Sequence, residues 1–327
     1  MYNFFNVQSP LQMLSAISAA EAFNTRKKVL LINLSKGNRK ENDTQIVNLI
    51  DYNFWDEVII HRKGFGPTRK ILRNIRLVIL KLKYQRKIDT YFFGEFRDFN
   101  MAVLGETLKP LRKVLLDDGA FTITAQNKYI RNNIFPFSHI LENKKSRKYK
   151  SIFINYSFPN LYSFFKLKMV SDQVNYFNHS DLSRKSVELL AGEIYFFGSK
   201  FYERNNMDLD DELSVISRAL EKYKGYKVFY IPHRDESDLK LKRISELVFQ
   251  VKNLGKPAEI FFEETKFMPE IIISYFSTVL YTCYIKFSNV SIVSLDVEND
   301  LKNEYWRDSA KSIYEYYREL GIPILKV

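Results

Sequence analysis

The chain has 327 residues, long enough for two domains with buried cores, and its 46% hydrophobic and 27% charged residues are typical of a folded rather than a disordered protein. A single cysteine, Cys283, excludes a disulfide framework and indicates a reducing cytoplasm, and no apolar run reaches the ~20 residues of a membrane span. The formal net charge of +12 favours an anionic partner, which composition leaves open between nucleic acid, anionic lipid and an anionic substrate.

The N-terminal stretch "MYNFFNVQSPLQMLSAISAAEAF" predicts a short strand, a turn at Ser9-Pro10 and a helix, and it lacks the basic start of a secretory signal peptide. Apolar, β-branched or aromatic runs then alternate with helical patterns along the chain. Near-continuous runs of this length are typical of parallel strands covered on both faces. The predicted strands span residues 28–34, 56–61, 89–94, 113–119, 193–198, 226–232, 258–263, 270–276 and 290–295.

The alternation of strands and helices predicts a doubly wound α/β architecture. The set "YFFG" occurs at 91–94 and at 195–198, each time closing a strand, which indicates two analogous sheets. Residues from about 140 to 188 are poor in strand signal, so we expect an irregular connection that ends a first domain of residues 1–188. The second domain, residues 189–327, ends in an amphipathic helix and the stretch "IPILKV".

The stretch "TRKILRNIRLVILKLKYQRK", residues 68–87, predicts a basic helix with a strong apolar component. Such a helix can lie on an anionic membrane face. It can equally pack into the core and expose a solvated basic face. The sequence leaves both interpretations open.

The stretch "LLDDGAF" places Asp117 and Asp118 at the tip of a predicted strand. Ligands of parallel sheets bind outside the carboxyl ends of the strands. Two neighbouring carboxylates raise each other's proton affinity, as a general base requires. Gly119 permits a sharp turn or the close approach of a ligand. The alternative is a solvated turn with an Asp cap for the next segment.

The stretch "YIPHRDES" repeats this arrangement in the second half of the chain, where Pro232, His233 and Arg234 follow a strand. A histidine there can donate a proton, or stabilise a leaving phosphate as imidazolium. The alternative is a surface histidine in a polar loop.

Hydroxyl and carboxylate groups follow three further predicted strands. Ser277 and Thr278 open a helix and can offer donors to an anion at its positive end, or act as an ordinary N-cap. Ser199 follows the strand at 193–198. Glu263 and Glu264 come after "EIFF", at the end of the strand predicted at 258–263, and can accept hydrogen bonds from ribose hydroxyls, or simply be solvated.

No Cys/His cluster has metal-ligand spacing. Asp208 and Asp210 match an Asp-x-Asp pattern, but they lie in the first turn of a predicted helix, where acidic residues need no metal. We therefore expect no metal and no bound cofactor.

The order Asp-Asp-Gly, Pro-His and Ser-Thr resembles the bacterial sialyltransferases of the GT-B fold, in particular the lipooligosaccharide sialyltransferase and polysialyltransferase groups. The stretches "SPLQMLSAI", which contains Gln12, and "GSKFYE" also resemble landmarks of those groups. Their motif has histidine before proline, whereas this chain has Pro232 before His233. The resemblance implies two Rossmann-like domains facing a central cleft.

The resemblance also implies roles for individual residues. Asp117 is expected to be the general base that deprotonates the acceptor hydroxyl, with Asp118 orienting it. His233 is expected to be the general acid, or the cation that meets the departing phosphate of CMP. The residues expected to bind substrate or nucleotide are Gln12, Gly119, Ser199, Pro232, Arg234, Glu263, Glu264, Ser277 and Thr278.

The implied function is an inverting, metal-independent transfer of sialic acid or a related nonulosonic acid from a CMP-activated donor. The expected acceptor is a cell-surface glycan or lipid-linked saccharide of a capsule or lipooligosaccharide. The expected location is cytoplasmic, peripheral at the inner face of the bacterial cytoplasmic membrane, where the helix over 68–87 helps the enzyme to reach its acceptor.

Two alternatives stay open. One is a GT-B transferase that uses another donor, such as a UDP-hexose. The other is a non-enzymatic basic module that binds an anionic membrane surface or nucleic acid. Recognisable nucleic-acid modules are absent from the sequence, so we expect no nucleic-acid partner. The oligomeric state is left open.

Overall fold

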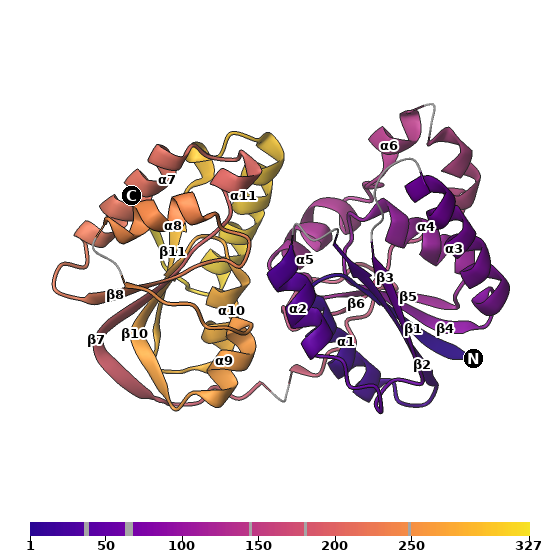
Figure 1. The fold of residues 1–327 in the computed structure, drawn as a ribbon, viewed down its shortest axis with the longest axis horizontal. Coiled ribbons are helices and arrows are strands. Elements are labelled where there is room, and N and C mark those ends of the chain that lie inside the picture. The colour runs from indigo at the N-terminus through magenta and orange to yellow at the C-terminus, as the bar shows by residue number, and fades with distance from the viewer. Residues whose placement is uncertain (36–38, 63–67, 144–145, 180–181, 248–249) are drawn as a thin grey trace. The chain divides into compact units, whose positions relative to one another are not determined.

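The computed structural model describes residues 1–35, 39–62, 68–143, 146–179, 182–247 and 250–327. These residues form two compact units, each built on a six-stranded parallel sheet flanked by helices (Figure 1). The N-terminal unit comprises Met1–Asp118 and Ala125–His179, and the C-terminal unit comprises Gly119–Thr124 and Ser180–Val327. The predicted doubly wound α/β architecture with two analogous sheets is confirmed.

The chain passes between the two units more than once. The short segment Gly119–Thr124, directly after the two aspartates, belongs to the C-terminal unit, and the chain returns to the N-terminal unit at Ala125. It leaves that unit again after His179. The boundary predicted between residues 188 and 189 lies inside the first strand of the second sheet, β7 (Glu188–Phe197).

The sheet of the N-terminal unit has the strand order β3-β2-β1-β4-β5-β6. Its strands are β1 (Tyr2–Val7), β2 (Lys27–Leu34), β3 (Glu57–Arg62), β4 (Ile88–Phe93), β5 (Arg112–Leu116) and β6 (Asn160–Tyr162). Its α-helices are α1 (Pro10–Ala22), α2 (Lys40–Asn48), α3 (Thr68–Tyr84), α4 (Phe99–Leu108) and α6 (Ser138–Glu142). A π-helical turn (Ala125–Ile130) and a 3-10 helix (Arg147–Phe153) complete the unit.

Helix α1 begins as the sequence predicts. The Ser9 hydroxyl accepts a hydrogen bond from the backbone N–H of Gln12 at 3.3 Å, and Pro10 occupies the first turn, where its missing N–H costs nothing. This cap fixes Gln12 in the first turn of α1, beside the end of β1. Helices α1 and α2 share one apolar cluster with the sheet, whereas Val103 of α4 lies in a separate cluster.

The sheet of the C-terminal unit has the order β12-β11-β10-β7-β8-β9. After β7 its strands are β8 (Lys227–Ile231), β9 (Gln250–Val251), β10 (Phe267–Ser274), β11 (Ser291–Asp296) and β12 (Ile324–Lys326). Its α-helices are α5 (Phe121–Thr124), α7 (Leu209–Glu221), α8 (Asp238–Ser245), α9 (Ala258–Glu264), α10 (Thr278–Lys286) and α11 (Glu304–Glu319). Two 3-10 turns lie at Tyr202–Arg204 and Glu298–Asp300.

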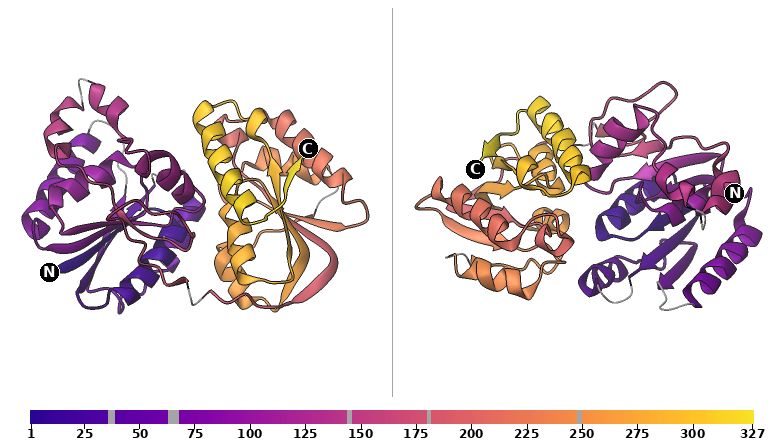
Figure 2. Two further views of the ribbon diagram at one scale, coloured as in Figure 1. Left: turned by 180° about the vertical axis from the view of Figure 1, so that it is seen from behind. Right: turned by 90° about the horizontal axis from the view of Figure 1, so that it is seen from above.

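Apolar side chains join α7, α8 and α11 to one face of this sheet. Ile216, Ile244 and Tyr314 from the three helices pack in one cluster with Ile194 and Ile273 from β7 and β10. Figure 2 shows α11, in yellow, lying along the sheet. The amphipathic C-terminal helix predicted from the sequence is therefore a structural element of the core.

One predicted strand is wrong. Residues 258–263 form most of helix α9 instead of a strand. Pro257 is the N-cap residue of α9, with a φ of −52° and a ψ of 141°, and Glu259 provides the acidic first turn that favours a helix start. Strands β6, β9 and β12 were not predicted, because two or three residues at a sheet edge carry too short a pattern. In the described part of the chain, no helix is long and apolar enough to cross a membrane.

Candidate active site

The two sheets have the same topology, and this fixes where each can bind a ligand. The strand order reverses between β1 and β4 in the N-terminal unit and between β7 and β10 in the C-terminal unit. Open parallel sheets bind ligands outside the carboxyl ends of the strands at such a reversal. Each unit therefore has its own candidate site. The N-terminal candidate site comprises Gln12, Gly94, Glu95, Arg97, Asp117 and Asp118. The C-terminal candidate site comprises Gly198, Ser199, His233, Glu236, Ser277 and Thr278.

Asp117 is buried at the end of β5, and its carboxylate is engaged. One oxygen accepts from the Ser163 hydroxyl at 2.6 Å, and the other accepts from the backbone N–H of Phe164 at 2.8 Å. The Asp117 N–H donates to the Ser15 hydroxyl at 3.2 Å. These contacts tie the end of β5 to α1 and to the segment after β6, so Asp117 has a structural task.

Asp118 meets a different set of groups. Its Oδ1 accepts from the Gln12 side-chain amide at 2.6 Å, and its Oδ2 lies 3.6 Å from Nη2 of Arg97. Burial of the carboxyl and the nearby Glu95 carboxylate raise the pKa of Asp118 well above its ordinary value, although Arg97 opposes this effect. A carboxylate with a raised pKa holds a proton more firmly, which is the property required of a base that deprotonates a hydroxyl.

Glu95 and Arg97 were missed by the sequence reasoning. Arg97 donates through Nε to Oε1 and through Nη2 to Oε2 of Glu95, both at 2.8 Å, which is a bidentate ion pair. Burial opposes ionisation of Glu95, but the Arg97 guanidinium prevails and lowers the pKa of Glu95. Both residues directly follow the first "YFFG", so the strand-end rule that selected Asp118 also identifies them.

The glycine that ends each "YFFG" leaves space for neighbouring polar side chains in both units. A Cβ atom on Gly94 would lie 2.3 Å from Oε1 of Gln12, the residue that donates to Asp118. A Cβ atom on Gly198 would lie 2.1 Å from the hydroxyl of Tyr230 and 2.2 Å from Oε1 of Glu236. In each unit, the bare glycine backbone leaves room for the polar side chains that support the residue predicted to be catalytic.

His233 follows β8, as predicted. Its backbone N–H donates to Oε1 of Glu236 at 2.9 Å, and its Nδ1 accepts from the backbone N–H of Asp235 at 3.1 Å. Because Nδ1 accepts a hydrogen bond, the neutral ring carries its proton on Nε2. Nε2–H can therefore donate to an anionic oxygen.

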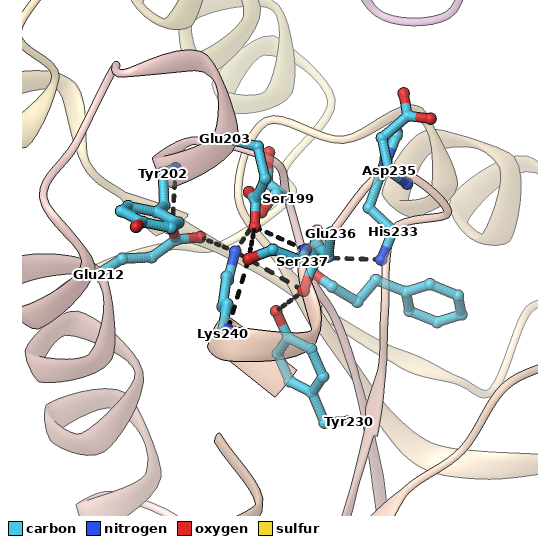
Figure 3. A network of polar contacts seen from close by, with 12 residues as sticks. Ser199, Tyr202, Glu203, Glu212, Tyr230, His233, Asp235, Glu236, Ser237 and Lys240 are labelled. Carbon is cyan, nitrogen blue, oxygen red and sulfur yellow. Dashed lines mark hydrogen bonds and ion pairs between the residues drawn. The ribbon is translucent and has the colours of Figure 1, made fainter. Parts of the chain in front are cut away.

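A buried polar network supports this loop (Figure 3). The Tyr230 hydroxyl donates to Oε2 of Glu236 at 2.9 Å, and the buried Lys240 ammonium lies 3.6 Å from the same oxygen and 2.5 Å from Oε1 of Glu212. Burial raises the pKa of Glu236 to about 7, although Lys240 opposes this effect. The network joins β8, α8 and α7, so the backbone of His233 is held by rigid elements.

Ser277 and Thr278 lie at the start of α10, as predicted. In the described residues the Ser277 side chain makes no capping hydrogen bond, and its backbone carbonyl accepts from the Tyr317 hydroxyl at 2.7 Å. The Thr278 hydroxyl accepts from the backbone N–H of Ala120 at 2.7 Å. Thr278 thus holds the segment after Gly119, whose φ of +70° gives the sharp turn predicted there, in the C-terminal unit.

The remaining predicted residues of the C-terminal unit lie in two places. Ser199, Pro232 and Arg234 lie in the loops after β7 and β8, and the Ser199 carbonyl accepts a hydrogen bond from Lys240. Glu263 and Glu264 lie at the end of helix α9 instead of at a strand end, where they are exposed and form ion pairs with Lys286 and Lys256. The structure therefore does not bring these two glutamates to the strand-end loops.

No metal site emerges from these side chains. Within the described ranges, no group of three or more His, Cys, Asp or Glu residues is placed to hold an ion.

A comparison with family models finds no match for this chain, and none of the curated proteins matches it. Among solved structures, the chain is similar to UDP-GlcNAc 2-epimerase of Methanocaldococcus jannaschii in complex with UDP-GlcNAc and UDP, with 13% identity, a TM-score of 0.51, and coverage of 100% of this chain and 89% of the epimerase. An alpha/beta-galactoside alpha-2,3-sialyltransferase of Photobacterium phosphoreum aligns with 13% identity and a TM-score of 0.45 over 99% and 98% of the two chains. MurG of Acinetobacter baumannii aligns with 11% identity and a TM-score of 0.45 over 100% and 86%. These likenesses concern the fold, and the predicted GT-B fold is confirmed.

Proposed function

We propose that this chain, which has the GT-B fold, is an inverting glycosyltransferase that moves sialic acid or a related nonulosonic acid from a CMP-activated donor to a hydroxyl of a glycan. The observation that carries the proposal is the arrangement of Asp118 at the tip of β5. A carboxylate of raised proton affinity, held by Gln12 and Arg97, suits the deprotonation of an acceptor hydroxyl.

We assign the base to Asp118, whereas the sequence resemblance assigned it to Asp117. Both oxygens of Asp117 already accept hydrogen bonds from Ser163 and Phe164, and protonation of Asp117 would disturb that anchor. Asp118 is coupled to the Glu95–Arg97 ion pair, which can adjust its proton affinity without loss of a structural contact. Asp117 then positions the loop that carries Asp118.

The groups of the C-terminal candidate site support the proposed leaving-group chemistry. As the acceptor oxygen forms its bond to the anomeric carbon, the bond from that carbon to the CMP phosphate breaks and the phosphate takes the electron pair. The acceptor proton passes to Asp118. Nε2–H of His233, the Ser277 hydroxyl and the N-terminus of α10 can stabilise the charge that develops on the phosphate.

A different nucleotide donor is the second candidate. The M. jannaschii epimerase with which this chain shares its fold was solved with UDP-GlcNAc and UDP. A fold of this kind accommodates many donors, so the fold by itself does not choose between CMP and UDP.

We also propose that the enzyme attaches to the anionic inner face of the cytoplasmic membrane through α3. Six large apolar side chains of this helix are 50–78% exposed, and they are Ile71, Leu72, Ile75, Val78, Ile79 and Leu82. Their spacing places them on one face of the helix. Residues 68–87 contain many Lys and Arg and no Asp or Glu. A second copy of the chain would bring like charges together at this face, whereas an anionic bilayer complements them.

The experiment that tests the proposed activity is a melting curve of the protein in EDTA with CMP, UDP or GDP. Ligand that binds only the folded state raises the melting temperature. A rise with CMP alone supports the CMP-donor transferase, and a screen of CMP-activated nonulosonic acids follows. A rise with UDP alone moves the assignment to a UDP-sugar donor. No rise with any nucleotide overturns the transferase and leaves the basic binding module.

A further inference from the structure

A cavity of about 360 Å³ lies in the N-terminal unit, between the carboxyl ends of β1–β3 and the helices α3 and α4. Its volume falls in the range of about 300–1,000 Å³ that small-molecule sites occupy. Apolar side chains dominate its wall, including Leu31, Leu77, Leu80 and Leu104. No residue of the N-terminal candidate site lines this cavity, and the function proposed above does not account for it.

Arg76 of α3 reaches into this wall. Its Nε atom is buried and has no hydrogen-bond partner, and no side chain in the described part of the chain forms an ion pair with Arg76. A guanidinium nitrogen that has lost water without gaining a hydrogen-bond partner costs free energy in the folded protein. Burial accordingly lowers the pKa of Arg76 to about 10. This cost is removed when an anion enters the cavity.

The other charged groups at the cavity do not neutralise Arg76. Asp98 caps α4, and its Oδ1 accepts from the backbone N–H groups of Asn100 at 2.8 Å and Met101 at 3.0 Å. Two residues at the end of β3 also line the cavity, and they are Arg62, which is a cation, and His61, which adds no negative charge. The cavity thus combines apolar walls with an excess of cationic groups over its one carboxylate.

We propose that this cavity binds an amphipathic molecule in which an alkyl or isoprenyl chain carries a phosphate, with the phosphate at Arg76 and the chain against the leucines. The inference rests on the proposed function and deepens it, because it assigns a lipid-linked acceptor to the enzyme. Leu72 belongs both to the cavity wall and to the exposed apolar face of α3. A lipid held by the bilayer can therefore reach the cavity along that face.

The test is a titration of the full-length protein with dodecyl phosphate below its micelle concentration, without nucleotide. Arg76→Met keeps the length of the side chain and removes its charge. We expect this variant to bind at least about tenfold more weakly, as the loss of a charged hydrogen bond implies. The matched control is Lys81→Met, an exposed cation of the same helix that does not line the cavity, and we expect its affinity to be unchanged.

A second measurement separates ligand binding from a structural role. Without ligand, Arg76→Met should melt at the same or a higher temperature, because it removes an uncompensated charge. A lower melting temperature with unchanged affinity would show that Arg76 is structural and would overturn the proposal. Equal binding by both variants, or no binding by the natural chain, would also overturn it.

Further ligands identify the source of the phosphate. Inorganic phosphate that binds as tightly as dodecyl phosphate would overturn the role of the apolar walls. Preference for dodecyl phosphate over dihexanoylphosphatidic acid assigns a single-chain lipid carrier, and the reverse preference assigns a membrane phospholipid. Because these titrations contain no nucleotide, failure to bind CMP overturns the proposed donor without affecting them.

Discussion

Asp117 and Asp118 are adjacent in sequence and differ in almost every contact. Side chains of successive residues at the end of a strand point to opposite sides, so neighbours enter different surroundings. Asp117 accepts from Ser163 and Phe164 in the core, and Asp118 accepts from Gln12 and lies near Arg97. The pair therefore divides into an anchor and a candidate base.

We predict that Asp118→Asn and Asp117→Asn fail in different ways. Asp118→Asn should lower kcat by about 10²–10⁴-fold, the usual contribution of a general base, with little change in melting temperature. Asp117→Asn should destabilise the fold by about 1.5–3 kcal/mol, because it loses hydrogen bonds to a charged group. Transfer assays and denaturant unfolding measure both effects. Asp208→Asn, an exposed carboxylate paired with Lys302, is the control.

The opposite pattern would return the role of base to Asp117. In that case Asp117→Asn would be inactive and stable, and Asp118→Asn would retain transfer.

The pH dependence of the reaction follows from the group around Asp118. A base acts in its deprotonated form, so the rate should rise with pH through the raised pKa of Asp118. Glu95→Gln removes the like charge that raises this pKa, and we expect the acid limb of kcat/KM to move to lower pH. Arg97→Gln removes the opposing cation and should move the limb to higher pH. An acid limb that neither variant shifts would exclude Asp118 as the titrating group.

At the scale of elements, α3 differs from the other amphipathic helices of the chain. Helices α7 and α11 bury their apolar faces against the sheet, whereas α3 exposes six large apolar side chains. The sequence pattern of α3 is compatible with a buried and with an exposed apolar face, because the periodicity of apolar residues does not show what they pack against. The folded structure decides between them, because these six side chains of α3 are exposed instead of packed against the sheet.

We predict that the triple variant Ile75→Ser, Val78→Ser, Leu82→Ser loses binding to vesicles of phosphatidylcholine and phosphatidylglycerol at a ratio of about 7:3, because membrane affinity scales with buried apolar area and charge attraction. Co-sedimentation measures the bound fraction. The matched control is Leu111→Ser, Ile134→Ser, Ile154→Ser, which removes three equally large exposed apolar side chains elsewhere in the N-terminal unit.

Vesicle binding should be weak without phosphatidylglycerol and should fall with salt. The opposite outcome has two parts: the natural chain binds no vesicles, and it forms a dimer that the α3 variant dissociates. That outcome would show that the exposed face of α3 contacts a second copy of the chain instead of a membrane.

For the molecule as a whole, the buried network that supports the loop of His233 makes the free energy of unfolding depend on pH. The pKa of Glu236 is about 7 in the folded chain, against an ordinary value of 4.5. A carboxyl whose folded pKa is raised stabilises the fold fully below its unfolded pKa, and this contribution is lost as pH rises through the folded value. Between pH 4.5 and 7 the contribution of Glu236 to the free energy of unfolding falls by about 3 kcal/mol, at 1.36 kcal/mol per pH unit.

Glu236→Gln should therefore remove most of the loss of stability of the natural chain between pH 4.5 and 7. Melting temperatures of the two proteins across this range measure the effect, and the difference between them isolates Glu236 from other titrating groups. Glu246→Gln, an exposed carboxylate on the surface beside α8, is the control. Parallel curves for all three proteins would contradict the assignment of a raised pKa to Glu236.

The two-sheet α/β architecture and the positions of the strand-end loops can be predicted from the sequence alone. Near-continuous apolar runs dictate buried parallel strands, and parallel sheets place their ligand loops at the carboxyl ends. This rule predicts Asp118, His233 and Ser277 as site residues, because each lies shortly after a strand that is long and apolar enough to recognise. The same rule selects Glu95 and Arg97, which lie after the first "YFFG".

The contacts and proton affinities of these side chains depend on residues that are distant in the sequence. The proton affinity of Asp118 depends on Glu95 and Gln12, which are distant in sequence and meet at it through the pairing of β4 and β5 and the start of α1. Glu263 and Glu264 lie at the end of helix α9 instead of at a strand end, because residues 258–263 fold as a helix. The unpartnered Arg76 and its cavity exist only once α3 packs over the sheet. Burial and long-range neighbours set these properties, and a local pattern does not contain them.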